Sequence, residues 1–206
     1  MLRNFAQIIS YVFHPLSMAT LLVAILYFFA PTSLHPIDSK SILYIFFIVL
    51  TFTYIFPVIS VLVLKHAGVV KSVHLQDKEE RLVPFLFTAG FYALNTYMFA
   101  GKLELYNALT VMLGATTITV FLVALISILV KISVHATATG GLIGLLLALK
   151  FTYLDSTLFW PVIFAFIIHG IVSSSRLYLH THTPKEVHGG ALLGFITNFG
   201  IAYFYL

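Results

Sequence analysis

The sequence predicts an all-α membrane protein, a multi-pass bundle of about six to seven transmembrane helices. Hydrophobic residues make up 60% of the 206 residues, charged residues make up only 9%, and the mean hydropathy is +1.03. A soluble domain carries roughly 25% charged residues. Long uncharged runs recur along the chain, and the segments between them are too short for a soluble domain. Residues 1–206 are therefore expected to form a single membrane domain.

The apolar runs define the spans in order. Pro15, directly after His14, predicts a kink in the first span, where His14 is interpreted as a kink or interfacial residue. Pro31 and Pro36 mark a short loop after this span, and the longest polar segment, residues 66–84, follows the second. The expected spans are residues 5–29, 41–64, 85–100, 105–130, 136–153, 157–174 and 187–206.

Two glycine-rich segments open the fifth and seventh spans. They read GGLIG at residues 140–144 and GGALLG at residues 189–194, and each follows a polar stretch that contains histidine. Small residues at this spacing allow helices to approach closely in a membrane. We therefore expect these two helices to pack against each other.

The polar stretch from Ser175 to His188 is the most informative segment. It places an arginine, a lysine, a glutamate and three histidines between two apolar runs, which is costly in a membrane unless the groups are solvated or used. With seven spans, this stretch shares one face with the N-terminus, with residues 66–84 and with residues 131–135. An anion site is predicted there, built from Arg81, Ser133, His135, Arg176, His182 and Glu186.

The spacing of these residues resembles the motifs of the type 2 phosphatidic acid phosphatase superfamily. The third motif of that family is Ser-Arg, five residues, His, three residues, Asp. It is matched by Ser175, Arg176, His182 and Glu186, with Glu in place of Asp. The likeness covers roughly the C-terminal two thirds of the chain.

The other two motifs are less complete. The second motif of the family is Pro-Ser-Gly-His. The chain has its serine and histidine at Ser133 and His135 but lacks the proline and the glycine. The first motif of the family is Lys, six residues, Arg-Pro. The chain has its arginine at Arg81, but the nearest proline, Pro84, comes three residues later, and His74 stands at the lysine position. The residues that can supply the missing ammonium are Lys78 and Lys131.

The resemblance implies a metal-independent lipid phosphate or pyrophosphate phosphatase that needs no cofactor. It makes His182 the nucleophile of a phosphohistidine intermediate, oriented by Glu186, and His135 the acid for the leaving group. Independently, the i, i+4 spacing of His182 and Glu186 places both on one side of a helical turn. A helix start at Pro184 explains Glu186 equally well. The expected phosphate-binding residues are Arg176, Arg81, Ser133, Lys78 and Ser175.

The sequence identifies neither the substrate nor the molecule that accepts its phosphate. Candidate substrates are a polyprenyl pyrophosphate, a phosphatidic acid, a phosphatidylglycerophosphate and a lipid A phosphate. A transferase with the same phosphohistidine is one alternative, and a non-enzymatic, histidine-lined carrier of ions or haem is another. The only expected partners are the lipid phosphate and membrane lipids, with no nucleic acid.

The remaining histidines and the missing cysteines set further limits. The absence of cysteine excludes disulfides, thiolate catalysis and Cys-ligated metal. A histidine metal site at the last polar stretch is disfavoured by the neighbouring Arg176, which repels a divalent ion. We interpret His35, His66 and His169 as hydrogen-bonded interfacial residues. His180 and His188 have two open interpretations: they support the residues of the site, or they are interfacial residues without a role in it.

Membrane orientation has two opposing indicators. We expect a multi-pass protein of a bacterial inner membrane, and the family resemblance implies a site on its non-cytoplasmic face. The positive-inside rule instead places the site face in the cytoplasm, because that face has more lysine and arginine residues. Several of these residues are, however, assigned to phosphate binding. The predicted site face carries Arg3, Lys65, Lys71, Lys78, Arg81, Lys131, Arg176 and Lys185, against Lys40, Lys102 and Lys150 on the other face.

Overall fold

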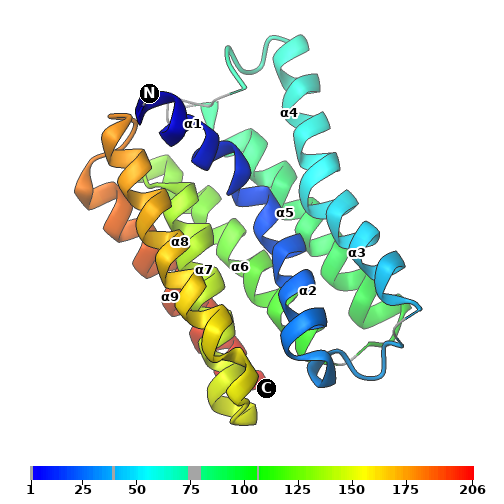
Figure 1. The fold of residues 1–206 in the computed structure, drawn as a ribbon. Helices are drawn as coiled ribbons and strands as arrows, with labels where there is room; N and C mark the ends of the chain where they lie inside the picture. Colours follow the sequence, from blue (N-terminus) through cyan, green and yellow to red (C-terminus); the bar gives the residue numbers. More distant parts are fainter. Residues whose placement is uncertain (1, 39, 74–79, 106) are drawn as a thin grey trace.

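The protein is an up-and-down bundle of membrane-length helices (Figure 1). The computed structural model describes residues 2–38, 40–73, 80–105 and 107–206. Within these residues, seven helical segments are long and apolar enough to cross a membrane, which confirms the predicted fold class. They are Leu2–Phe29, Ile42–His66, Leu82–Lys102, Ala108–Leu129, Val134–Tyr153, Ser156–Tyr178 and Pro184–Tyr205.

The first span is interrupted, as predicted. It consists of α1 (Leu2–Val12), a 3-10 turn (Pro15–Ser17) and α2 (Met18–Phe29). Proline lacks an N–H and pushes the preceding residue out of the helical region, and His14 is extended, with φ −65° and ψ 139°. The Nδ1 atom of His14 accepts a hydrogen bond from the Leu16 N–H at 3.3 Å. The expected role of His14 at the kink is confirmed.

The second and third spans contain wide helical turns. The second comprises α3 (Ile42–Leu50), a π-helical turn (Thr51–Ile55) and α4 (Phe56–His66). The wide turn precedes Pro57, which cannot donate a backbone hydrogen bond and crowds the turn before it. In the third span, α5 (Leu82–Tyr97) continues into a second π-helical turn at Met98–Lys102.

The remaining spans are α6 (Ala108–Leu129), α7 (Val134–Tyr153), α8 (Phe159–Tyr178) and α9 (Pro184–Tyr205). Much of the polar stretch around residues 175–188 is helical, since α8 runs four residues past its expected end and α9 begins three residues early. Thr183 and Glu186 form a capping box that explains the early start of α9, with Pro184 in its first turn.

Helix α7 packs closely against α9, as the glycine pattern predicted. A Cβ atom added at Gly140 would lie 2.6 Å from the carbonyl oxygen of Ala191 on α9. One added at Gly194 would overlap the carbonyl oxygen of Thr137 on α7. The backbones of the two helices therefore touch without intervening side chains.

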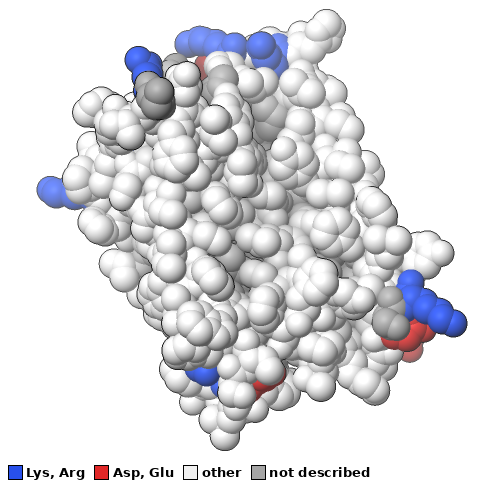
Figure 2. All heavy atoms as spheres, in the orientation of Figure 1, with Lys and Arg blue, Asp and Glu red and all other residues white. Residues whose placement is uncertain are grey.

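The outer surface is that of a membrane protein. On the face drawn in Figure 2, charged side chains lie towards the two ends of the bundle, and a broad uncharged band separates them. Large apolar side chains such as Leu129, Trp160 and Phe204 are exposed, as expected where lipid covers them.

Replacing Gly194 with alanine should destabilise the bundle by about 1–3 kcal/mol, because the added methyl group overpacks the contact between α7 and α9. The measurement is denaturant titration of the purified protein in detergent, followed by circular dichroism. Gly200→Ala is the matched control, since a Cβ atom at Gly200 on the same helix has nothing within 4 Å. Equal stability of the two variants would contradict the close-packing account.

Candidate active site

A cavity of about 910 Å³ opens between the helices on the face where the N-terminal helix and the link between α8 and α9 lie. Its described lining residues include Arg3, Arg81, Lys131 and Arg176 but no aspartate or glutamate. Arg81, which caps the start of α5, and Tyr92 within α5 both line it, and their separation of 11 positions corresponds to about 16 Å along the helix. The cavity thus reaches roughly halfway through a hydrocarbon core of about 30 Å.

The His182–Glu186 pair lies at the start of α9. The Nδ1 atom of His182 is 2.7 Å from Oε2 of Glu186, and the two side chains are 7% and 20% exposed. A carboxylate at this distance fixes the proton of a neutral imidazole on Nδ1, which leaves the lone pair of Nε2 free. His182 lines the cavity, whereas Glu186 is not among its lining residues. This is the geometry of an oriented nucleophile or base.

The environment keeps His182 neutral. Burial is the main cause that lowers the pKa of His182 to about 4, and the cations Arg176 and Lys131 act in the same direction. The hydrogen bond and negative charge of Glu186 offset part of this shift. The imidazole is therefore neutral at neutral pH, the state in which Nε2 has a lone pair to share.

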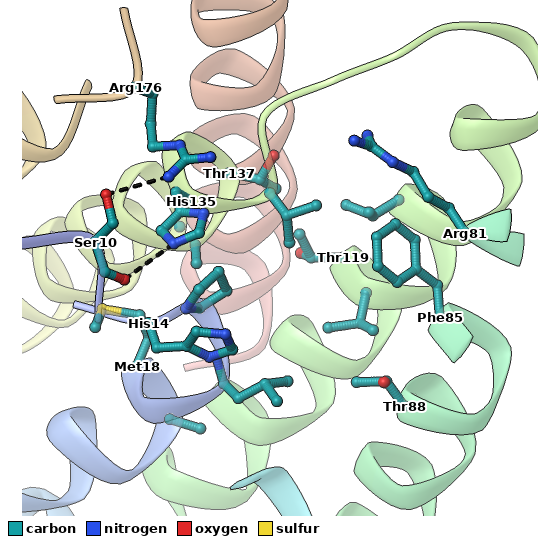
Figure 3. A pocket seen from close by; sticks show the side chains of 18 of the residues that line it. Ser10, His14, Met18, Arg81, Phe85, Thr88, Thr119, His135, Thr137 and Arg176 are labelled. Carbon is teal, nitrogen blue, oxygen red and sulfur yellow. Dashed lines mark hydrogen bonds between the residues drawn. The ribbon is translucent and has the colours of Figure 1, made fainter. Parts of the chain in front are cut away.

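Two arginines from distant segments face the cavity from opposite sides (Figure 3). Arg176, in the last turn of α8, donates from Nη1 to the hydroxyl oxygen of Ser10 at 3.1 Å. Its Nε atom is buried and has no hydrogen-bond partner among the described residues. Arg81 is 5% exposed, and its Nη1 donates to the carbonyl oxygen of Ile132 at 3.4 Å. A buried donor without a partner is costly, so Arg176 is suited to an anionic ligand.

His135 lies on the same side of the cavity as Arg176. Its Nε2 atom is 3.1 Å from the backbone carbonyl oxygen of Ser10, and its ring packs edge-on against His14 with centroids 5.8 Å apart. Ser133 is fully buried and does not line the cavity. Its hydroxyl caps α7 by accepting from the Ala136 N–H, and its own N–H donates to the Glu186 carbonyl oxygen at 3.1 Å. Ser133 therefore joins the start of α7 to the first turn of α9.

The structure brings together most of the residues predicted for the site. Arg81, His135, Arg176 and His182 line one cavity, and Lys131, one of two candidates for the missing lysine, lines it too. Lys78, the other candidate, and His74 lie outside the described residues.

Ser175 is not brought into this group. Its hydroxyl donates to the Ile171 carbonyl oxygen at 2.8 Å, and it borders a shallow apolar groove between α1 and α8. Successive residues of a helix point about 100° apart, so Ser175 and Arg176 face different surroundings.

Sequence reasoning missed the contribution of the first span. Arg3, Gln7, Ser10 and His14 all line the cavity, and their spacing of three and four residues places them on one side of α1 and its end. This polar stripe in an apolar run is the signal that identifies the helix as part of the site.

The other histidines differ in their surroundings. His169 lies within α8, and its ring nitrogens are 2.7 Å from the Thr139 hydroxyl and 3.4 Å from that of Ser173. It is hydrogen-bonded as expected, but inside the bundle and not in an interfacial loop. His180 lines the cavity with φ +53°, whereas His188 is exposed and is not among the lining residues. In the described part of the chain, no three His, Asp or Glu side chains are grouped to hold a metal ion.

Comparisons of the chain with protein-family models, curated proteins and solved structures find no match. A functional interpretation therefore depends on the geometry of the cavity and on its chemistry.

The free energy of unfolding should rise with pH between about 4 and 6.5, in part because of His182. As the pH falls through this window, the unfolded imidazole gains a proton while the folded one, with its pKa of about 4, does not. His182→Gln should reduce the rise, measured by thermal unfolding in detergent at several pH values. His66→Gln, at an exposed histidine that ends α4, is the control. An unchanged slope in His182→Gln would contradict the assignment.

Proposed function

We propose that the protein is a membrane-embedded, metal-independent phosphatase that acts on a lipid phosphate or pyrophosphate through a phosphohistidine. The observation that supports this most directly is the convergence of His182, Arg176, Arg81 and His135 on one cavity. Their segments are far apart in the chain, yet they supply a nucleophile, two guanidinium groups and a proton carrier. Phosphoryl transfer needs these groups around one phosphorus atom.

The two arginines and Lys131 hold the phosphate. Planar guanidinium groups match phosphate oxygens with two parallel hydrogen bonds, and Arg176 has a buried Nε–H to offer. Among the described residues that line the cavity, no carboxylate competes for these donors. The site therefore favours an anion of at least two negative charges.

The reaction takes place in two steps. In the first, the bound phosphate anion favours uptake of a second proton from solvent on Nδ1 of His135. Nε2 of His182 then attacks phosphorus, an N–P bond forms, and the bond to the lipid oxygen or lipid phosphate breaks as His135 passes this proton from Nδ1 to the leaving group. In the second, a water molecule attacks phosphorus, His135 takes its proton, and the N–P bond breaks to release inorganic phosphate. Glu186 stabilises the positive charge that His182 acquires in between.

The lower part of the cavity suits the lipid tail. Below the arginines its lining is largely apolar and includes Met18, Leu22, Phe85, Val120 and Leu142. A depth of about 16 Å leaves room for an extended apolar chain that lies parallel to the helices. A headgroup at the cationic mouth and a tail between the helices place the scissile bond beside His182.

Phosphate release by the purified protein in detergent, with EDTA present, tests the proposal. Wild type should release phosphate from at least one lipid in a panel of lipid phosphates and pyrophosphates. His182→Ala and Arg176→Ala should abolish release, and Glu186→Gln should slow it by about 10- to 1,000-fold because the nucleophile loses its orienting group.

His35→Ala, on the opposite face and outside the described cavity lining, is the matched control and should keep full activity. Equal loss in His35→Ala and His182→Ala would contradict the proposal. Phosphohistidine formation without phosphate release would favour a transferase, tested with added lipid or sugar acceptors. Bound metal or haem with function unchanged by Arg176→Ala would favour a carrier.

We further propose that the protein lies in a bacterial inner membrane with its site on the non-cytoplasmic face, as the family resemblance implies. The C-terminus is on the face opposite the N-terminus (Figure 1). A C-terminal green fluorescent protein should therefore fold in the cytoplasm and fluoresce, and a C-terminal alkaline phosphatase should be inactive. The reverse pattern would place the site in the cytoplasm.

A further inference from the structure

The break in the first span leaves carbonyl oxygens in the last turn of α1 without a partner in the helix, and that of Ser10 is one of them. The Phe13 N–H donates to the Ile9 carbonyl at 2.9 Å, and His14 then turns into an extended conformation because Pro15 follows it. The next carbonyl, that of Ser10, receives no backbone hydrogen bond from the described residues. It accepts from His135, 125 residues away, at 3.1 Å instead.

This contact decides which nitrogen of His135 faces the substrate. A carbonyl oxygen can only accept, so the proton of a neutral His135 ring lies on Nε2. Nδ1 is then the nitrogen left for proton exchange in the cavity. The edge-on contact with the His14 ring holds the imidazole from a second side (Figure 3).

The side chain of Ser10 makes a second contact with the site. Its hydroxyl donates to the Ala6 carbonyl oxygen at 2.9 Å, which orients its lone pairs, and it accepts from Nη1 of Arg176 at 3.1 Å. One residue of α1 thus contacts both His135 and Arg176, through its backbone and its side chain respectively.

We infer that Ser10 is a positioning residue, and that the proline break at residue 15 exists to free its carbonyl. Its carbonyl holds His135 with Nε2 protonated and Nδ1 towards the substrate, and its hydroxyl holds the Arg176 guanidinium in place. The kinetic part of this inference depends on the proposed phosphatase activity, but the protonation of His135 does not.

Nitrogen NMR of the wild-type protein, labelled with ¹⁵N-histidine in lipid nanodiscs, tests the first part directly. The signals of His135 are assigned by their loss in His135→Gln. Near neutral pH they should show a neutral ring protonated on Nε2. A ring protonated on Nδ1 would overturn the inference. Because this spectrum needs no substrate, it decides the point even if no lipid is hydrolysed.

Pro15→Ala tests the role of the break. Alanine allows α1 to continue through His14, whose N–H would then compete with His135 for the Ser10 carbonyl. We expect mixed His135 tautomers, and a kcat at least 10-fold lower with a KM within about 2-fold of wild type. Pro31→Ala, at an exposed helix start on the opposite face, is the control and should match wild type. A wild-type spectrum and kcat in a folded Pro15→Ala protein would overturn the role of the break.

Ser10→Ala tests the second contact while leaving the backbone carbonyl in place. Loss of one hydrogen bond to a buried guanidinium should raise KM, and the inhibition constant of inorganic phosphate, by about 3- to 10-fold, with the His135 spectrum unchanged. Ser10→Thr keeps a hydroxyl and should restore both values. Ser60→Ala, which removes a hydroxyl bonded within α4, is the control. Wild-type constants in Ser10→Ala would overturn this part.

Discussion

The close contact between α7 and α9 is the constraint on which the site depends. In a membrane, apolar side chains gain little by leaving lipid, so two helices associate closely mainly where small residues let their backbones touch. Gly140 and Gly194 provide this contact, and the Ser133 N–H extends it by donating to the Glu186 carbonyl oxygen at 3.1 Å. The first turn of α9 is thereby fixed beside the first turn of α7, so the His182–Glu186 pair and His135 share one cavity. No charged residue is needed for this alignment.

Electrostatics then determines what the cavity can accept. Four permanent cations are among its described lining residues and no carboxylate is, which is unfavourable in a partly desolvated space until an anion enters. Glu186 does not line the cavity; it lies behind His182 and is hydrogen-bonded to it at 2.7 Å. Its charge therefore orients the imidazole without neutralising the arginines. A single ligand with concentrated negative charge and a long apolar tail satisfies both parts of the cavity.

Sequence predicted the scaffold well and the site in part. Long apolar runs, Pro15 and the glycine clusters specified the seven spans, the kink and the packing of α7 on α9, because each depends on local composition or spacing. The motif spacing selected four residues that line one cavity. The orientations of Ser133 and Ser175 were not accessible, since a hydroxyl that caps or bonds back to its own helix has the same sequence signature as one that binds ligand. The contacts of Ser10 span 125 and 166 residues, and no local pattern encodes such pairs.

The two histidines of the site are oriented by different kinds of acceptor, and the difference follows from their surroundings. His182 bonds a carboxylate, which would stabilise the positive charge of the ring in the proposed phosphohistidine. His135 lies beside Arg176, where a carboxylate would pair with the guanidinium and compete with any anionic ligand for it. A neutral backbone carbonyl orients the ring without adding negative charge. A helix interior offers no such free carbonyl, because each is bonded four residues onward. Interrupting the first span at a proline is therefore a direct way to orient a histidine within a membrane while keeping the cavity cationic.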